Sequence, residues 1–239
     1  MSNQIFIKNF RAAVSNERID KYRQRGVSGG DENLLVHYAW NIALAESLYP
    51  ILQCMEIALR NSVHDAATVA YRSEFWFDTP GLLEAKSVDE IAKARANLTA
   101  MGKPITAAGL IAEQNFGFWT ACFNTSQEGL LWPRIYRQTF PGLPKHLRKR
   151  STIMRQLNDI RKLRNRIFHH EPIWYFNDLR PKHAQILQLI DWMSPAMSEF
   201  ATAIDRFPAL YNNGMTTFQS ELEKKLAHVN QQPIQPLTS

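Results

Sequence analysis

Apolar residues recur every three or four positions along most of this chain, and that spacing predicts helices. The clearest run places Ile153, Leu157, Ile160, Leu163 and Ile167 on one side of a helix. Similar runs cover 34–48, 51–71, 87–101, 105–123 and 181–204. No alternating run of useful length indicates a strand, and no glycine-rich loop follows one. The pattern therefore predicts an all-α bundle.

Prolines, glycines and capping residues predict where these helices begin and end. Asp31 can cap the first long helix, and Pro50 either breaks that helix or opens a new one at its first turn. Gly102 is placed to end the helix before it, and Gly117 is a candidate break in the next one. Ser151 can cap the helix that contains Ile153.

Composition changes along the chain suggest three parts. Residues 1–30 are predicted to form an arm, with one short helix that starts near Ser15 and a flexible joint. Residues 31–207 form the helical domain. Residues 208–239 form a polar tail, of which 231–239 are expected to be loose.

The overall composition is that of a globular protein. Of 239 residues, 45% are hydrophobic and 21% charged, which argues against a disordered chain and allows one domain or two small ones. A net charge of +6 predicts attraction to polyanions, RNA first among them. A basic protein without a nucleic-acid partner remains the alternative.

Two cysteines and the absence of a long uninterrupted apolar segment predict a cytoplasmic protein. Cys54 and Cys122 lie in helical patterns and are interpreted as small buried hydrophobes in a reducing compartment. Residues 1–11 are too polar for a secretory signal. Polar residues interrupt the apolar stretch 105–123, so we expect no segment to span a membrane.

The end of the 153–167 helix carries the candidate chemistry, Arg164-Asn165 followed by His169-His170. Histidine suits proton transfer near neutral pH, and the arginine fork suits a phosphate. Five residues place Arg164 and His169 about 140° apart around a regular helix. They can meet at one phosphate only if the arginine wraps round or the helix end distorts. Alternatively, Arg164 pairs with Asp159 or Glu56, and His169 caps the helix.

Arg164-Asn165-x-x-x-His169 resembles the R-x(4–6)-H signature of the HEPN superfamily, many members of which are metal-independent RNases. Together with Trp40-Asn41, Glu56-Ile57-Ala58-Leu59-Arg60-Asn61 and His169-His170-Glu171-Pro172, it is similar to the abortive-infection (Abi-like) branch of bacterial phage-defence proteins. The resemblance covers about 15–192. It implies a HEPN-like bundle, a homodimer in which two motifs face one cleft, and catalytic Arg164, Asn165, His169 and His170.

A second group, Arg60-Asn61-x-x-His64, is one residue too short for the signature. It either lines the phosphate cleft, with Glu56 orienting Arg164 or His169, or forms a surface row of Glu56, Arg60 and His64. The basic loop 145–150 is a candidate grip on the RNA backbone or a solvated face. The predicted RNA-binding residues are Arg60, Asn61, His64, Lys145, Arg148, Lys149, Arg150, Arg161 and Arg166.

No metal or other cofactor is predicted. His169, His170 and Glu171, with His183, are candidate metal ligands, but their spacing matches no H-E-x-x-H or Cys/His pattern. The resemblance to Abi-like HEPN proteins implies a phage-defence endoribonuclease that leaves 2′,3′-cyclic phosphate and 5′-hydroxyl ends. The alternatives are a non-catalytic helical RNA- or protein-binding module, and the toxin of a toxin–antitoxin pair with a cognate antitoxin or regulator.

Overall fold

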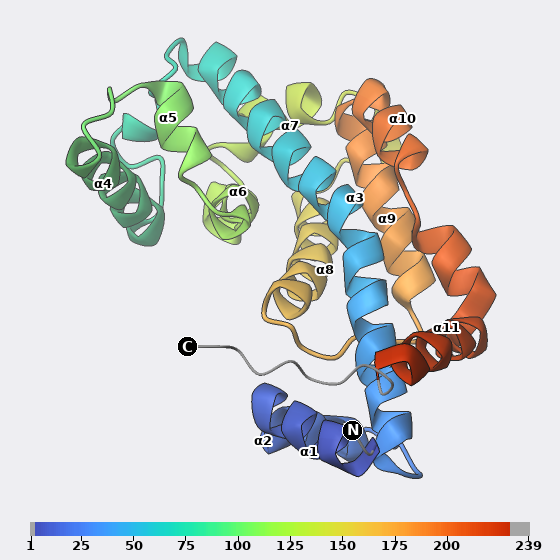
Figure 1. Cartoon of the computed structure of the whole chain (residues 1–239). Helices are drawn as coiled ribbons and strands as arrows, with labels where there is room; N and C mark the ends of the chain where they lie inside the picture. The colour runs from blue at the N-terminus through green and yellow to red at the C-terminus, as the bar shows by residue number, and fades with distance from the viewer. Residues whose placement is uncertain (1–2, 230–239) are drawn as a thin grey trace. The chain divides into compact units, whose positions relative to one another are not determined.

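The structure is a computed structural model that describes residues 3–229 (Figure 1). Across this range the regular elements are all helices, so the predicted all-α class is confirmed. The α-helices are α1 (Asn3–Val14), α2 (Asn16–Gln24), α3 (Asp31–Tyr71), α4 (Ala85–Ala100), α5 (Ala107–Ala112), α6 (Phe116–Ala121), α7 (Trp132–Thr139), α8 (Arg150–Phe168), α9 (Leu179–Met193), α10 (Pro195–Ala203) and α11 (Phe207–Val229).

Helix α3 runs through Pro50, which neither breaks it nor opens a new helix. Proline removes one backbone hydrogen bond, but Leu48, Ile51 and Leu52 around it are buried, and this burial favours a continuous helix. By length and composition alone α3 could cross a membrane. Half of its apolar window is buried inside the protein, however, and the core helix of a soluble protein passes the same test.

Two predicted helices are divided by side-chain caps. The stretch 105–123 forms α5 and α6, separated before Asn115, whose side chain accepts a hydrogen bond from the Phe118 N–H at 3.2 Å. Gly117 lies inside α6 and is not the break. Ser194 likewise separates α9 from α10 by accepting the Met197 N–H at 3.3 Å. A side-chain acceptor that satisfies a first-turn N–H stabilises a new helix start.

Helix α8 begins one residue before its predicted cap. The Lys149 carbonyl already accepts hydrogen bonds from the N–H groups of Thr152 and Ile153, so Ser151 lies within the helix. The basic segment before it contains α7, which was not predicted, and a short 3-10 turn at Lys145–Leu147.

The chain divides into two compact units. The first contains Met1–Tyr49, Arg166–Asn177 and Asp205–Ser239, and the second contains Pro50–Asn165 and Asp178–Ile204. One boundary therefore falls inside α3 at Pro50, and another inside α8 after Asn165. Residues 1–30 belong to the first unit, together with the start of α3, the segment around the end of α8, and α11.

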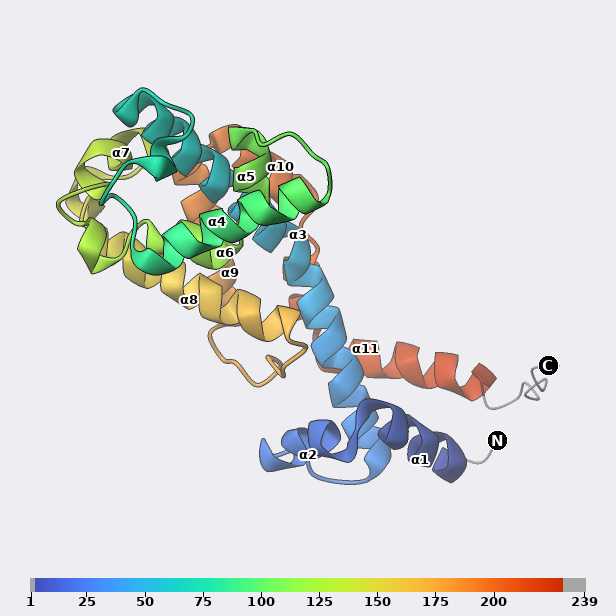
Figure 2. The same cartoon turned by 90° about the vertical axis from the view of Figure 1, so that its left-hand side faces the viewer.

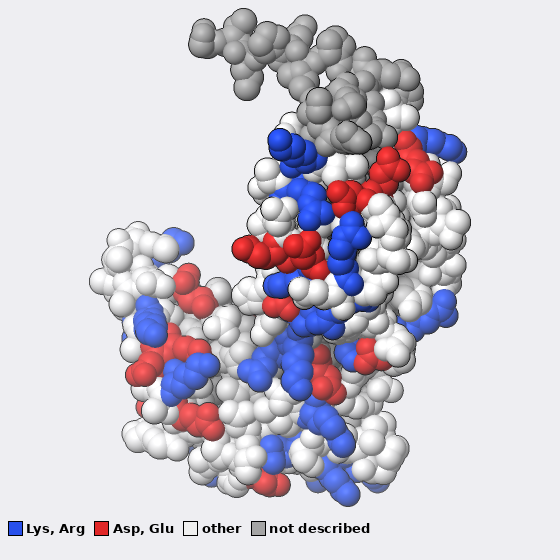
Figure 3. Space-filling view, turned by 90° about the horizontal axis from the view of Figure 1, so that it is seen from below, with Lys and Arg blue, Asp and Glu red and all other residues white. Residues whose placement is uncertain are grey.

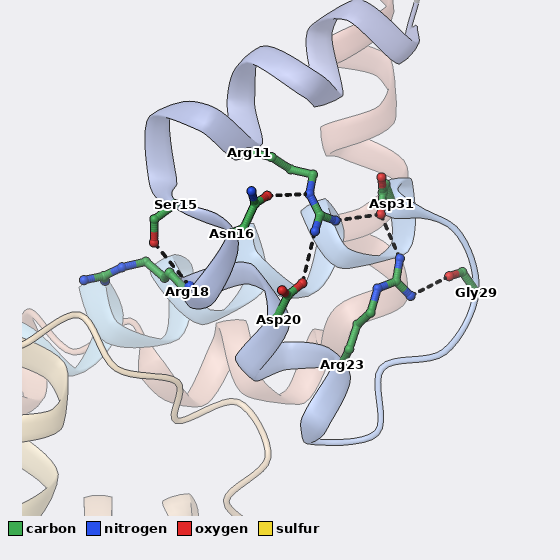
Figure 4. Close-up of polar contacts among 8 residues, drawn as sticks. All are labelled: Arg11, Ser15, Asn16, Arg18, Asp20, Arg23, Gly29 and Asp31. Atoms are coloured by element: carbon green, nitrogen blue, oxygen red, sulfur yellow. Dashed lines mark hydrogen bonds and ion pairs between the residues drawn. The ribbon is translucent and has the colours of Figure 1, made fainter.

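In the first unit, α1 and α2 lie side by side and close a small core against the start of α3 (Figure 2). Arg11 of α1 joins them through Asp20 and Asp31, each at 3.0 Å, and Arg23 adds a second ion pair to Asp31 (Figure 4). The arm is thus two helices where one was predicted. The core between the arm and α3 consists of buried Ile19, Tyr22, Val27 and Leu34, with Phe10, Val14, Tyr38 and Trp174 packed against them.

Residues 208–229 of the predicted polar tail lie in α11, which begins at Phe207, ends at Val229 and has a kink at Gly214 (φ 72°). Trp40 of α3 packs against Phe218 of α11, with ring centroids 5.6 Å apart. The expected loose end at 231–239 lies outside the described residues.

The second unit has its core along α8, α9 and the later part of α3. Cys54 and Cys122 are free and buried, as predicted, and burial raises the pKa of Cys122 to about 12. The side chains that are fully shielded from solvent include Ile51, Met55, Leu59, Trp76, Trp119, Phe123, Ile153, Leu157, Ile160, Ile186, Leu189 and Ile190.

Candidate functional site

The Arg-Asn-His motif lies at the end of α8. The five apolar positions of this helix, from Ile153 to Ile167, are all buried, as their spacing predicted. Arg164 and Asn165 belong to the helix, and His169 and His170 follow directly after its last residue, Phe168. The division between the two units falls after Asn165, so Arg164 belongs to the second unit and the histidines belong to the first.

Arg164 forms an ion pair with Glu56 of α3, within the second unit. The Arg164 Nη2 and Glu56 Oε2 atoms are 3.3 Å apart, and the side chains retain 22% and 27% of their exposure. Of the two acidic partners considered from the sequence, Glu56 is the one that the structure supplies. A partly buried carboxylate that accepts a hydrogen bond from the planar guanidinium fixes the direction of the guanidinium. Asn165, the next residue, is exposed.

His169 and His170 form the turn that ends α8, in the first unit. The His170 N–H donates to the Ile167 carbonyl at 3.0 Å, and the Glu171 N–H donates to the Arg166 carbonyl at 2.8 Å. This is a Schellman turn, whose left-handed residue is commonly glycine. Here that residue is His170, with φ of 56°. Both imidazoles are exposed, and the His170 carbonyl accepts a hydrogen bond from Arg18.

Arg166 holds the segment after the histidines. Its guanidinium pairs with Glu171 at 3.0 Å and donates to the Pro172 carbonyl and the Tyr175 hydroxyl. Tyr175 also lies under the Arg25 guanidinium, 4.1 Å from the ring centroid. Although it was predicted to bind RNA, Arg166 is thus engaged with its own chain.

Asn41 holds the same segment from α3. Its buried Oδ1 accepts the N–H groups of Ile173 at 2.6 Å and Trp174 at 3.3 Å. Trp40-Asn41 is among the residues that carry the resemblance, but no role was predicted for Asn41. An amide in an otherwise apolar helix pattern was the available signal, because a buried polar group requires a partner.

In the second cationic group, His64 contacts a distant residue of the second unit, whereas Arg60 contacts its neighbour in the sequence. The side chain of Arg60 donates to Asn61, and Trp76 Nε1 donates to His64 Nδ1 at 3.2 Å. Burial is the main cause that lowers the pKa of His64 below its usual value. Glu56 pairs with Arg164 and not with Arg60 among the described side chains, so the predicted surface row of Glu56, Arg60 and His64 is not formed.

The basic loop before α8 contains both buried and exposed cations. Arg150 is 9% exposed and donates to the Phe123 carbonyl, and Arg148 donates to the Leu143 carbonyl. Lys145 and Lys149 are exposed, and Arg161, on α8, is partly exposed. Lys and Arg side chains form several groups, with Asp and Glu between them, on the face shown in Figure 3.

Within residues 3–229 no group of three or more His, Cys, Asp or Glu side chains is arranged to hold a metal ion. His183, the fourth candidate ligand, is a buried residue of α9. Comparison of the chain with protein-family models, with curated proteins and with solved structures gives no match. The site is therefore interpreted from its residues alone.

Proposed function

We propose that this chain is a metal-independent endoribonuclease of the HEPN type that acts in the cytoplasm of bacteria and limits phage growth. The observation that carries the proposal is the Arg-Asn-x-x-x-His order at the end of α8, where Glu56 orients the arginine and the histidines are exposed. The proposed role of the chain in phage defence rests on the sequence resemblance to Abi-like proteins.

The reaction requires a base, a cation and an acid. A base takes the proton of the 2′-hydroxyl, which RNA has and DNA lacks. The 2′-oxygen then attacks phosphorus, the bond from phosphorus to the 5′-oxygen breaks, and an acid protonates that leaving oxygen. The products are a 2′,3′-cyclic phosphate and a 5′-hydroxyl. Charge builds on the phosphate oxygens during attack and must be stabilised.

The motif offers arginine for the phosphate charge and histidine for the proton transfers. Arg164 would stabilise the phosphate charge, and His169 would transfer the proton, with His170 as an alternative acid. Asn165 would hold His169 or a phosphate oxygen. With one histidine pair per chain, the resemblance implies that two chains combine their motifs as a homodimer.

The second candidate function is a non-catalytic RNA- or protein-binding module. The Arg164–Glu56 ion pair favours it, because an arginine with a structural role would make the same contact. A toxin held by a cognate antitoxin is compatible with either function, since a partner could cover the exposed histidines.

An RNA cleavage assay in the presence of EDTA separates these functions. Wild-type protein should cut RNA and leave cyclic phosphate ends, and an RNA with 2′-deoxyribose at the cut position should resist. Arg164→Ala should lower the rate by about 10² to 10³. Lys162→Ala, which removes a neighbouring exposed charge from the same helix, is the matched control and should cut normally. Binding of RNA without cleavage by folded wild-type protein would favour the binding module.

A further inference from the structure

The second unit carries a long stretch of chain with charge of one sign. Residues 129–158 contain seven Lys or Arg residues and no Asp or Glu. By contrast, α4 in the same unit carries Asp89 and Glu90 beside its lysines. The cationic residues of the stretch are Arg134, Arg137, Lys145, Arg148, Lys149, Arg150 and Arg155.

Two of these cations serve the fold. Arg150 is buried and donates to the Phe123 carbonyl at 2.8 Å, with Glu128 at 3.5 Å. Arg148 donates to the Leu143 carbonyl at 3.0 Å. The loop that they stabilise is also held by Gly142, whose N–H donates to the Trp192 carbonyl of α9. A Cβ on Gly142 would lie only 3.1 Å from the Trp192 Cα, so the loop and α9 are closely packed.

The cations of α7 face solvent and lie beside aromatic rings. Trp132, Ile135 and Thr139 are the buried side of this helix, which leaves Arg134 and Arg137 exposed. Arg134 lies over the ring of Tyr71, 5.3 Å from its centroid. Arg137 donates to the hydroxyl of Tyr136, whose half-buried ring stacks on Trp132.

We infer that Arg134 and Arg137 of α7, with Lys145 and Lys149 of the following loop, bind the phosphate backbone of single-stranded RNA. We call these four residues the α7 surface. Positive charge favours a polyanion, and the exposed guanidinium planes of Arg134 and Arg137, each already lying over an aromatic ring, can stack on unpaired bases. A duplex hides its bases, and an acidic protein or a lipid surface makes no use of stacking.

The inference rests on the proposed function only in naming RNA, and it adds a contact remote from the motif. Arg150 and Arg164 lie 14 residues apart on α8, which corresponds to about 21 Å along the helix. An RNA of two nucleotides cannot reach from the motif to the start of α8, whereas a longer strand can. The α7 surface should therefore affect long substrates only.

The test compares two triple variants of the full chain with equal loss of charge. Arg134→Gln, Arg137→Gln and Lys149→Gln alter the α7 surface, and Lys86→Gln, Lys93→Gln and Lys103→Gln alter exposed lysines elsewhere in the second unit. Fluorescence anisotropy measures binding of labelled single-stranded RNA at several salt concentrations, with His169→Ala added to prevent cleavage. Circular dichroism checks that both variants fold.

The α7 variant should bind long RNA at least tenfold more weakly than the control variant. Its log–log salt dependence should be shallower by about 2, because three phosphate contacts contribute about 0.7 each. Equal affinity of the two variants, or equal displacement of the RNA by polyglutamate and by unlabelled RNA, would overturn the inference.

RNA binding that depends on the α7 surface without any cleavage by wild type would defeat only the proposed function. Cleavage of long RNA by the α7 variant at the wild-type kcat/KM would defeat only the inference.

Discussion

At the scale of single residues, Asn41 fixes the main chain that follows the histidine pair. Its Oδ1 accepts two N–H groups from residues 132 and 133 positions later in the chain. Asn41→Ala would leave both donors without this acceptor, which should lower the free energy of unfolding by about 1–3 kcal/mol. Asn61→Ala, at an exposed site in the same helix, should change it by less than about 0.5 kcal/mol. Urea unfolding measures both, and equal effects would refute the role of Asn41.

His64 makes the stability depend on pH. Burial lowers its pKa in the folded state, so below about pH 6.5 the unfolded chain binds a proton that the folded chain resists. The contribution of His64 is fully present above that pH and is lost as the pH falls through the lowered value. His64→Gln can still accept the Trp76 N–H and does not titrate. Between about pH 7.5 and 5.5, wild type should therefore lose more stability in urea than the variant. Parallel losses would show that His64 is not responsible.

In α8, residue spacing predicted which side chains are buried, but not their polar partners. The apolar positions of α8 could be identified because a helix repeats every 3.6 residues. Trp76 beside His64 and Asn41 beside Ile173 depend on how distant segments pack, and the spacing within one helix contains no such information. For Arg164, two acidic partners were consistent with the sequence, and only packing distinguished Glu56 from Asp159.

At the scale of helices, α4 and α8 end in the same turn with different residues. The left-handed position is Gly102 in α4 (φ 64°) and His170 in α8 (φ 56°). A side chain in this conformation costs about 1 kcal/mol, so His170→Gly should raise the free energy of unfolding by about that amount. Gly102→Ala at the matched position should lower it by a similar amount. Thermal unfolding measures both, and a destabilised His170→Gly protein would contradict the expectation.

Helix existence could be predicted better than helix ends. Periodicity indicated the segments, whereas Asn115 and Ser194 introduced breaks through hydrogen bonds to the next turn. Pro50 shows the opposite case, where buried neighbours outweigh a local helix breaker. Helix α7 was missed because its eight residues are too few for a clear period.

At the scale of the whole molecule, two units share the motif, because one boundary follows Asn165. The residue types of the motif and their order could be read from the sequence. The placement of one unit against the other could not, because spacing along the chain does not contain it. We predict that a second chain completes the site. Static light scattering at micromolar concentration should give the mass of a dimer, and a monomer with undiminished activity would contradict this prediction.

The proposed endoribonuclease requires Arg164 and His169 to act on the same phosphate, and a double-mutant cycle in an RNA cleavage assay tests this requirement. Arg164→Ala should slow cleavage by about 10² to 10³ and His169→Ala by about 10² to 10⁴. Residues that act in one step are not additive, so the double variant should be no slower than the slower single variant. Two results would contradict a shared phosphate. One is cleavage at the wild-type rate by folded His169→Ala protein, and the other is a rate loss in the double variant equal to the product of the two single losses.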